Sequence, residues 1–299
     1  NANVANAVVL KNQNQGYSWS VTASLERAFS DGLFAKVAYN YGESKNTVDP
    51  GSIAFGSWNN NQHSGNPNNP GVAFSSNSPG HRVFASLSYR KEYFDFGATT
   101  VSLFWEGATI GNASYTLSGD LNGDGGTSND LIYIPRDVSE MNFQQYSVTI
   151  SGVTTTFTPQ QQAAAWDAYV NQDKYLSANR GKYAGRGGVF LPMVFRADLG
   201  VVQEVFADFL GKRNTLQLRV DLLNIGNLVN KNWGVSQRLV NAQPLIVPTT
   251  AQGGPADAQG RAQYRLRSIG DQLMSKSLEQ TVFLSDVFSL QLSVKYFFN

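Results

Sequence analysis

The sequence lacks cysteine and carries little charge. With no Cys among its 299 residues, the chain forms neither disulfide bonds nor thiolate metal sites. Charged residues make up 15% of the chain, and 23 Lys and Arg balance 22 Asp and Glu, so no net field attracts nucleic acid. No apolar run approaches the roughly 20 residues that a membrane-spanning helix needs. The chain opens at Asn1 without a Met or an apolar leader, and we expect a processed protein or a fragment.

What the sequence does contain is alternation. Between Tyr17 and Glu26 the odd positions are apolar or aromatic, and the even positions are Ser, Thr or Glu. Because successive side chains of a strand point to opposite faces, this segment predicts a strand with one apolar and one polar face. The pattern recurs in six further segments, at 33–42, 82–90, 99–106, 195–201, 216–222 and 290–298. We therefore predict seven antiparallel strands and no transmembrane helix.

The spacing of these segments favours a membrane barrel over a soluble β-sandwich, whose strands also alternate. Several segments run to ten residues or more, whereas sandwich strands usually have about 5–6. Tyr and Trp mark the ends of the apolar faces, as in interfacial girdles. Short turns at 30–32, 91–97 and 207–213 alternate with long polar segments at 45–80, 108–188 and 237–283. Short periplasmic turns and long extracellular loops are typical of outer-membrane barrels.

The predicted fold class is therefore all-β, a transmembrane antiparallel outer-membrane β-barrel with long extracellular loops, located in the outer membrane of a Gram-negative bacterium. Seven strands do not complete such a barrel, because bacterial single-chain barrels have an even number and at least eight. We expect the rest of the wall upstream of residues 1–299. The last segment ends on Tyr296-Phe297-Phe298-Asn299, which resembles the terminal aromatic signal of outer-membrane assembly, with Asn299 as a departure.

Several motifs resemble one family. Asp221-Leu222-Leu223-Asn224-Ile225-Gly226-Asn227-Leu228 resembles a motif of the penultimate strand in TonB-dependent receptors, and Gly16-Tyr17 resembles a strand entry of that family. The segments 119–124, 130–135 and 174–181 resemble loops of the Oar-like, carboxypeptidase-regulatory-like group of Bacteroidetes. The resemblance covers essentially the whole chain. It implies that these strands are the last seven of a 22-stranded barrel with a plugged lumen, whose plug and energy-coupling box lie upstream.

The resemblance implies a function that fold alone does not. The leading hypothesis is a TonB-dependent importer of a large or scarce ligand, with outer-membrane lipid, the TonB energy-coupling complex and an unknown extracellular ligand or surface protein as partners. The alternative is an adhesion or assembly barrel without a transport role. An enzyme is the third hypothesis, which we do not favour. His63 and His81 lack the close partners of a zinc site, no G-x-S-x-G occurs, and we expect both histidines at the surface or at the barrel mouth.

Segment 108–188 is too long to be bare coil, and we expect it to fold into a small extracellular cap with a hairpin and a helix. Thr158, Pro159 and Gln161 form a capping box with Pro at the first helical position, so a helix should run on through 163–176. Residues 147–157 alternate around Ser151-Gly152 and predict the hairpin. Trp166, Tyr169 and Val170 lie on one helical face, which we expect to dock on the barrel rim rather than to contact a ligand.

Segment 45–80 has a different composition. It is built from Asn, Gly, Ser and Pro, with Phe55, Trp58 and Phe74 interspersed. Exposed aromatic rings over a polar scaffold stack on sugars or pack on a partner, and they also anchor a loop to itself. The sequence leaves the two readings equal.

Charged residues predict the register of two hairpins. A turn centred on Asp31 places Glu26 opposite Lys36, and both lie on the polar face. A turn near 208–209 would place Arg196 opposite Asp221 and Asp198 opposite Arg219, in one register. We expect all three pairs on the lumen wall, where a slip by one residue would put charges into lipid.

One loop predicts a metal site. Asp120, Asn122 and Asp124 followed by Gly125 reproduce the first half of a D-x-N-x-D-G calcium loop, and Asp130 lies one position before the acid that such loops place at position 12. Three carboxylates in a short loop repel one another unless a cation neutralises them. Asp and Asn also favour turns without any ion. We expect a structural calcium ion bound by Asp120, Asn122, Asp124 and Asp130, which orders the cap and has no catalytic role.

Overall fold

Seven long strands form one antiparallel sheet in the computed structural model, which describes residues 7–94, 96–209 and 212–298 apart from the side chains of 207–209 and 212–213. Each strand pairs with the next long strand in the chain, and the short strand β3 (Ala73–Phe74) adds to the end of the second. The seven are β1 (Tyr17–Ala28), β2 (Leu33–Asn46), β4 (Gly80–Tyr93), β5 (Gly97–Thr109), β13 (Met193–Phe209), β14 (Lys212–Leu223) and β21 (Ser289–Phe297). The predicted number, order and antiparallel pairing of the strands are confirmed.

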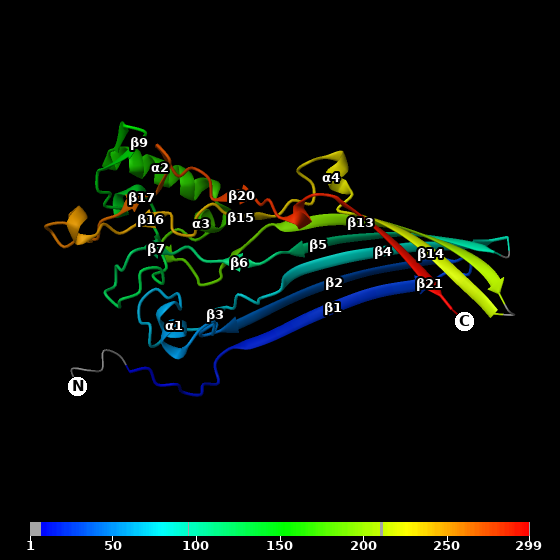
Figure 1. Cartoon of the computed structure of the whole chain (residues 1–299). Helices are drawn as coiled ribbons and strands as arrows, with labels where there is room; N and C mark the ends of the chain where they lie inside the picture. The colour runs from blue at the N-terminus through cyan, green and yellow to red at the C-terminus, as the bar shows by residue number, and fades with distance from the viewer. Residues whose placement is uncertain (1–6, 95, 210–211, 299) are drawn as a thin grey trace.

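The connections differ strongly between the two ends of the sheet (Figure 1). Short turns join β1 to β2 and β4 to β5 at one end, and the third expected turn includes 210–211, which lie outside the described residues. At the other end the connections are 47–79, 110–192 and 224–288. The third long connection thus begins earlier than the sequence suggested, because β14 ends at Leu223 and the short helix α4 (Gly226–Val229) follows it directly.

The long connections contain the remaining elements. No helix among the described residues combines the length and the apolar character needed to cross a membrane. The helices are α1 (Ala54–Asn59), α2 (Pro159–Gln172), α3 (Lys174–Ala178) and the 3-10 turns η1 (Val138–Glu140), η2 (Thr250–Gln252) and η3 (Leu284–Asp286). The short strands are β6 (Asn112–Ala113), β7 (Leu117–Ser118), β8 (Tyr133–Ile134), β9 (Tyr146–Ile150), β10 (Val153–Phe157), β11 (Lys182–Tyr183), β12 (Val189–Phe190), β15 (Gln237–Leu239), β16 (Leu245–Ile246), β17 (Arg265–Leu266), β18 (Ser268–Ile269), β19 (Gln272–Leu273) and β20 (Leu278–Gln280).

The predicted hairpin and helix are both present. Strands β9 and β10 pair around 151–152, and α2 begins with the expected capping box, in which Thr158 and Gln161 satisfy each other's backbone N–H groups. The helix does not continue to Leu176, however. Asp173 adopts an extended conformation, and its carboxylate accepts hydrogen bonds from the N–H groups of Tyr175 and Leu176, so it ends α2 and caps α3.

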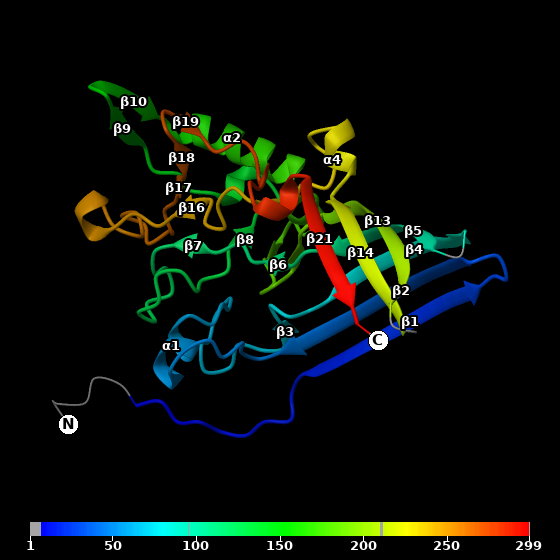
Figure 2. The same ribbon diagram turned by 45° about the vertical axis from the view of Figure 1, so that its right-hand side comes forward.

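The hydrophobic core of the described residues lies in these connections and not under the sheet. Segments 110–192 and 237–283 together form a compact unit, which we call the cap, beyond one end of the sheet (Figures 1 and 2). Trp166, Tyr169 and Val170 are fully buried inside it, so the apolar face of α2 packs in the cap core rather than on the sheet rim. All core residues lie outside the seven long strands: Tyr115, Leu117, Ile132, Ile134, Phe143, Trp166, Tyr169, Val170, Leu176, Ala184, Val189, Leu245, Val247, Leu266 and Met274.

The cap therefore needs both long connections. Strand β16 pairs with β17 from its own connection and, in parallel, with β7 from the other. Leu245, Leu266 and Met274 fill the core beside residues from 110–192. The sequence assigned a cap to 108–188 alone, and the structure adds the predicted segment 237–283 to it.

The register gives the sheet two unlike faces. One transverse row of directly paired residues crosses six strands and is apolar throughout: Leu33, Tyr89, Val101, Val201, Val220 and Leu292. The neighbouring positions along each strand point to the opposite face and are mostly polar. The predicted alternation is thus carried across the whole sheet in register.

Candidate functional site

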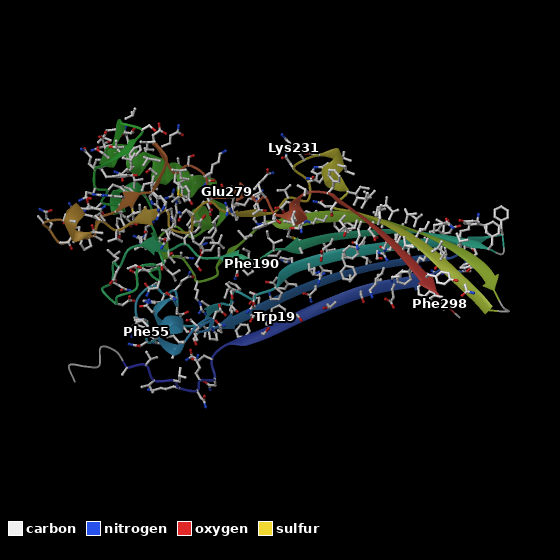
Figure 3. All side chains as sticks on the ribbon, in the orientation of Figure 1. Trp19, Phe55, Phe190, Lys231, Glu279 and Phe298 are labelled. Atoms are coloured by element: carbon white, nitrogen blue, oxygen red, sulfur yellow. The ribbon has the colours of Figure 1, made fainter. Side chains whose placement is uncertain are left out.

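The apolar face of the sheet is uncovered among the described residues. Tyr17, Trp19 and Leu25 are all exposed, Leu25 to 77%, and no second sheet packs on them. Figure 3 follows the strands from Trp19 on β1 to Phe298 at the end opposite the cap. The other exposed apolar residues on this face include Val21, Val37, Tyr39, Leu87, Tyr89, Val101, Leu103, Trp105, Phe195, Leu216, Leu218, Val220, Leu290, Leu292, Val294 and Tyr296. A continuous apolar surface of this extent marks a site of contact with another protein or with a membrane.

The polar face carries ion pairs across neighbouring strands. Lys36 Nζ lies 2.8 Å from Glu26 Oε2 in the predicted register, so this pair is confirmed. Arg82 binds Glu106 at 2.5 Å between β4 and β5, and Arg90 binds Glu204 of β13 across β5. These contacts link side chains on one face only, and they stabilise the register more than the fold, because exposed pairs contribute about 0–1 kcal/mol.

The other two predicted pairs are wrong. Strands β13 and β14 pair with Gly200 opposite Asp221 and Val202 opposite Arg219, four residues away from the expected register. The strands extend to Phe209 and from Lys212, so the turn lies further along the chain than 208–209. Arg219 instead pairs with Asp221 at 2.6 Å on its own strand, and both remain on the polar face.

Arg196 and Asp198 serve the connection 224–288. Arg196 donates to Gly234 O and Ser236 Oγ and lies 3.1 Å from Asp286. The Asp198 carboxylate accepts the N–H of Asn224 at 2.7 Å, where the chain leaves β14. Both residues therefore hold the backbone at the start and the end of the connection 224–288. The pairing of opposite charges across a hairpin does not predict such a role.

The loop that predicted calcium is folded around its first acid. The Asp120 carboxylate accepts the N–H groups of Gly123, Asp124 and Gly125 at 2.7–3.2 Å. Gly125 has φ +90°, which a side chain would strain, so the sharp turn needs glycine there. Asp120 thus shapes the loop, and its two oxygens are already used by the backbone.

The structure brings the other three predicted residues together and adds two more. The amide nitrogen of Asn122 donates to Asp124 at 3.1 Å and to Asp130 at 2.5 Å. His63 Nε2 lies 2.9 Å from Asp124 Oδ2, and Asn129 Nδ2 contacts both oxygens of Asp124. Single ligand atoms of His63, Asp124 and Asp130 all lie within 4.8 Å of one another. We call these five residues the acidic cluster.

The pKa values of Asp124 and Asp130 shift in opposite directions. Burial alone would raise the pKa of Asp124, but hydrogen bonds from the Gly126 N–H and from Asn129 and Asn122 outweigh it and lower that pKa. Burial raises the pKa of Asp130, N–H groups of Leu121 and Asn122 oppose the rise, and the negative charges of Asp124 and Asp120 add to it. Of these two carboxylates, Asp130 is the one whose negative charge is disfavoured overall, by burial and by its acidic neighbours.

His63 was expected at the surface and is instead 1% exposed. It forms a parallel bridge with Asp130, in which the His63 N–H donates to Asn129 O and the Leu131 N–H donates to His63 O. No local signal in segment 45–80 predicts this, because the partner lies more than sixty residues away. His81, at the start of β4, is exposed as expected and contacts Tyr39 through Nδ1.

A cavity of about 480 Å³ opens where segment 47–79 meets the cap. Most of its lining residues have polar side chains, among them Asp49, Asn61, Ser114 and the buried Arg186. The Arg186 guanidinium donates to Asn61 and Asn46, which fixes the floor of the cavity. This volume lies in the range of small-ligand pockets, but such pockets are usually lined mainly by apolar side chains.

Some aromatic residues of segment 45–80 anchor the segment, and one is exposed where it could contact a sugar or a partner. The Phe74 ring packs edge-on against Phe190 of β12, with Lys45 over its face, so it anchors the segment. Trp58 donates its ring N–H to Asn68 within the segment. Phe55 is exposed on α1, where Figure 3 places it at the cap end of the molecule.

Comparison with protein-family models, with curated proteins and with solved structures found no match for this chain.

Proposed function

We propose that this chain forms seven consecutive wall strands of an outer-membrane β-barrel, with lipid against its apolar face and the cap on the extracellular side. The observation that carries the proposal is the uncovered apolar face, which runs in register through the sheet while the core lies elsewhere. In water such a face is an aggregation surface, whereas in a bilayer it is the required one.

The dimensions of the sheet support this proposal. From Tyr17 to Phe29 the chain rises about 40 Å along the strand, which at a tilt of about 40° gives about 30 Å across a membrane. That matches a hydrocarbon core of roughly 30 Å. Aromatic residues lie at both limits, with Tyr17, Trp19 and Tyr41 towards the cap and Phe29, Tyr89 and Tyr296 towards the short turns.

In the proposed barrel, each end and each face of the sheet can be assigned to one side of the membrane or of the wall. Short turns belong on the periplasmic side and long connections on the extracellular side. The face that carries Glu26, Lys36, Arg82 and Glu106 would line the lumen. The outer edges of β1 and β21 pair with no further strand among the described residues, and in the proposed barrel further strands would complete the wall.

We propose a TonB-dependent importer as the function of the whole barrel. The support is the resemblance of segment 221–228 to TonB-dependent receptors and of segments 119–124 and 130–135 to Oar-like loops, together with a cavity of about 480 Å³ next to the cap. In that case these strands are the last seven of 22, and a plug and coupling box belong to the same protein. An adhesion barrel is the second candidate, and the size of the cap, with its own core, favours it.

Binding to the energy-coupling protein separates the two functions. The full-length protein, extracted in detergent, is mixed with the purified periplasmic domain of TonB from the same cells, and binding is measured by calorimetry. An importer binds this domain, and deletion of TonB abolishes its ligand uptake but leaves surface binding. Absence of binding, with loss of contact between cells that lack the protein, would identify the adhesion barrel.

A further inference from the structure

We propose that Asn122, Asp124 and Asp130 form a calcium site between segment 47–79 and the cap, and that His63 is a positioning residue for it. The inference does not rest on the membrane proposal, because every residue involved lies outside the seven long strands. It extends the sequence-based expectation of calcium by a residue from a second connection and by a structural consequence.

The cluster concentrates negative charge that only neutral groups separate. The charges that act on Asp130 are those of Asp124 and Asp120, both negative. Between Asp124 and Asp130 lies the amide nitrogen of Asn122, which donates to both carboxylates. That nitrogen lies between two acids that a cation would neutralise at once. A cation there would displace the amide, whose oxygen would then turn towards the ion as a ligand, as in loops that bind calcium.

A buried group without a partner also points to a ligand. Asn129 is 2% exposed, and its amide faces Asp124 and His63. Its oxygen Oδ1 has no hydrogen-bond partner among the described residues. Buried amide oxygens are rarely left unpaired, and calcium accepts side-chain amide oxygens as ligands. In this orientation the nitrogen of the amide faces the cluster, and its N–H groups meet the Nε2–H group of His63 donor to donor. Exchange of the amide oxygen and nitrogen removes this clash and turns the oxygen towards Asp124 and His63, where a cation would give it a further partner.

There is room beside the cluster for the rest of a coordination sphere. A cavity of about 210 Å³ is lined by His63, Asn122 and Asp130, with Tyr133, Tyr183 and Tyr264 on its other walls. Calcium takes six to eight oxygens and commonly fills open positions with water. The protein oxygens of Asn122, Asp124, Asp130 and Asn129 supply part of this number, and the cavity admits water for the remainder.

The tautomer of the His63 ring favours a cation that binds oxygen ligands over one that binds nitrogen. The N–H of Gly65 donates to His63 Nδ1 at 3.2 Å, so the ring proton lies on Nε2. The Nε2–H group then donates to Asp124 and cannot bind a metal ion. A zinc ion would need this nitrogen, whereas calcium needs only the Asp124 oxygen that His63 orients.

Occupation of the site would clamp segment 47–79 onto the cap. His63 is joined to residues 129–131 by two backbone hydrogen bonds of 2.9 Å, and its ring holds Asp124. A cation bound to Asp124 and Asp130 would therefore also stabilise the two backbone hydrogen bonds between His63 and residues 129–131. The same contact borders the junction where the larger polar cavity lies.

The test is a titration of the full-length protein in detergent, stripped of metal and then supplied with Ca²⁺, Mg²⁺ or Zn²⁺. Binding is followed by calorimetry and by terbium luminescence, which Tyr133, Tyr183 and Tyr264 would sensitise and Ca²⁺ would quench by displacement. The variants are Asp124→Asn and Asp130→Asn. The control is Asp257→Asn, because Asp257 also accepts backbone N–H groups in a cap turn but has no partner in the cluster.

We expect one saturable calcium site, unchanged in Asp257→Asn and weakened at least about tenfold in either cluster variant, a loss typical even of outer-shell changes. Mg²⁺ should bind more weakly, because it demands stricter octahedral geometry. Absence of saturable Ca²⁺ binding at millimolar concentration overturns the proposal. So does equal binding in Asp124→Asn and Asp130→Asn, and so does a Zn²⁺ site that excludes Ca²⁺.

The positioning role of His63 has its own readout. His63→Gln keeps an N–H donor for Asp124 and should keep calcium affinity within a few fold of the original, whereas His63→Ala should lower it by about tenfold. Calcium should also protect segment 47–79 from proteolysis in the original protein and in His63→Gln. Equal affinity in both His63 variants, or cleavage of the segment at the same rate with and without calcium, would contradict the role.

Discussion

Asp286 lies just before the last strand, β21, and its carboxyl group has a strongly lowered pKa. It accepts hydrogen bonds from Thr281 Oγ1 and from the N–H groups of Ser236 and Phe283, and Arg196 lies 3.1 Å away. Burial would raise its pKa, but these hydrogen bonds outweigh burial and hold the pKa at about 2. The carboxylate therefore ties β21 to the start of the third long connection.

Replacement of Asp286 by Asn should destabilise the protein in a pH-dependent way. Because the folded pKa lies below the ordinary value of 3.8, the stabilisation is present above that value and is lost as pH falls towards 2. A difference of this size corresponds to about 2 kcal/mol. Urea unfolding midpoints of both proteins should differ at pH 6 and converge near pH 2. A constant difference across this range would show that the variant acts through packing alone.

Individual residues were predicted well where one local turn fixes them. Glu26 and Lys36 flank a short turn whose centre the sequence indicates, and the pair forms as expected. The predicted pair of Arg196 and Asp221 depends on a turn that lies elsewhere. Both side chains still point to the predicted polar face, but the strands pair in a different register. His63 joined the acidic cluster from another connection, which no local pattern reveals.

At the scale of elements, α2 holds the core of the cap. Its capping box satisfies backbone N–H groups at the first turn, and Trp166 and Tyr169 stack at 5.5 Å inside the core. The helix was predictable because cap residues and apolar spacing are local signals. Its partners were not, because β16 and β17 reach the core from a connection more than sixty residues further along.

Thr158→Ala should weaken the cap and leave the sheet intact. The variant loses the hydroxyl that accepts the Gln161 N–H, a cost of about 1 kcal/mol. Hydrogen exchange should therefore speed up in α2 and across the cap core, with the seven long strands unchanged. Thr154→Ala is the control, since Thr154 lies on the nearby exposed hairpin and bonds only Thr149 by its side chain. Faster exchange in the long strands would contradict the independence of the cap.

At the scale of the whole molecule, the two faces of the sheet should tolerate charge differently. Leu103 lies on the apolar face and Ser102 on the polar face of the same strand, close to Asp221. In a membrane, Leu103→Lys should cost about 2–4 kcal/mol, as charges do near the midplane on the lipid side. Ser102→Lys should cost little. Denaturant titration in lipid vesicles measures both, and equal costs would argue against a lipid-facing surface.

The sheet was predictable from sequence because alternation is a repeated, local signal that seven segments share. The shape of the cap was less so, since its core depends on contacts between two distant connections. The sequence also indicated the apolar face itself, but its continuity across strands became visible only with the register.

The membrane proposal is tested most directly by cysteine substitution along one strand. Residues 1–299 contain no cysteine, and any Cys elsewhere in the protein is first replaced by Ser. Residues 99–105 of β5 are replaced one at a time in the protein as its cells produce it, and each thiol is probed with a water-soluble maleimide and with a label quenched by brominated lipid chains. We predict a period of two: positions 101, 103 and 105 quenched by lipid and closed to maleimide, with 100, 102 and 104 the reverse. Maleimide labelling of both sets at similar rates would contradict the proposal.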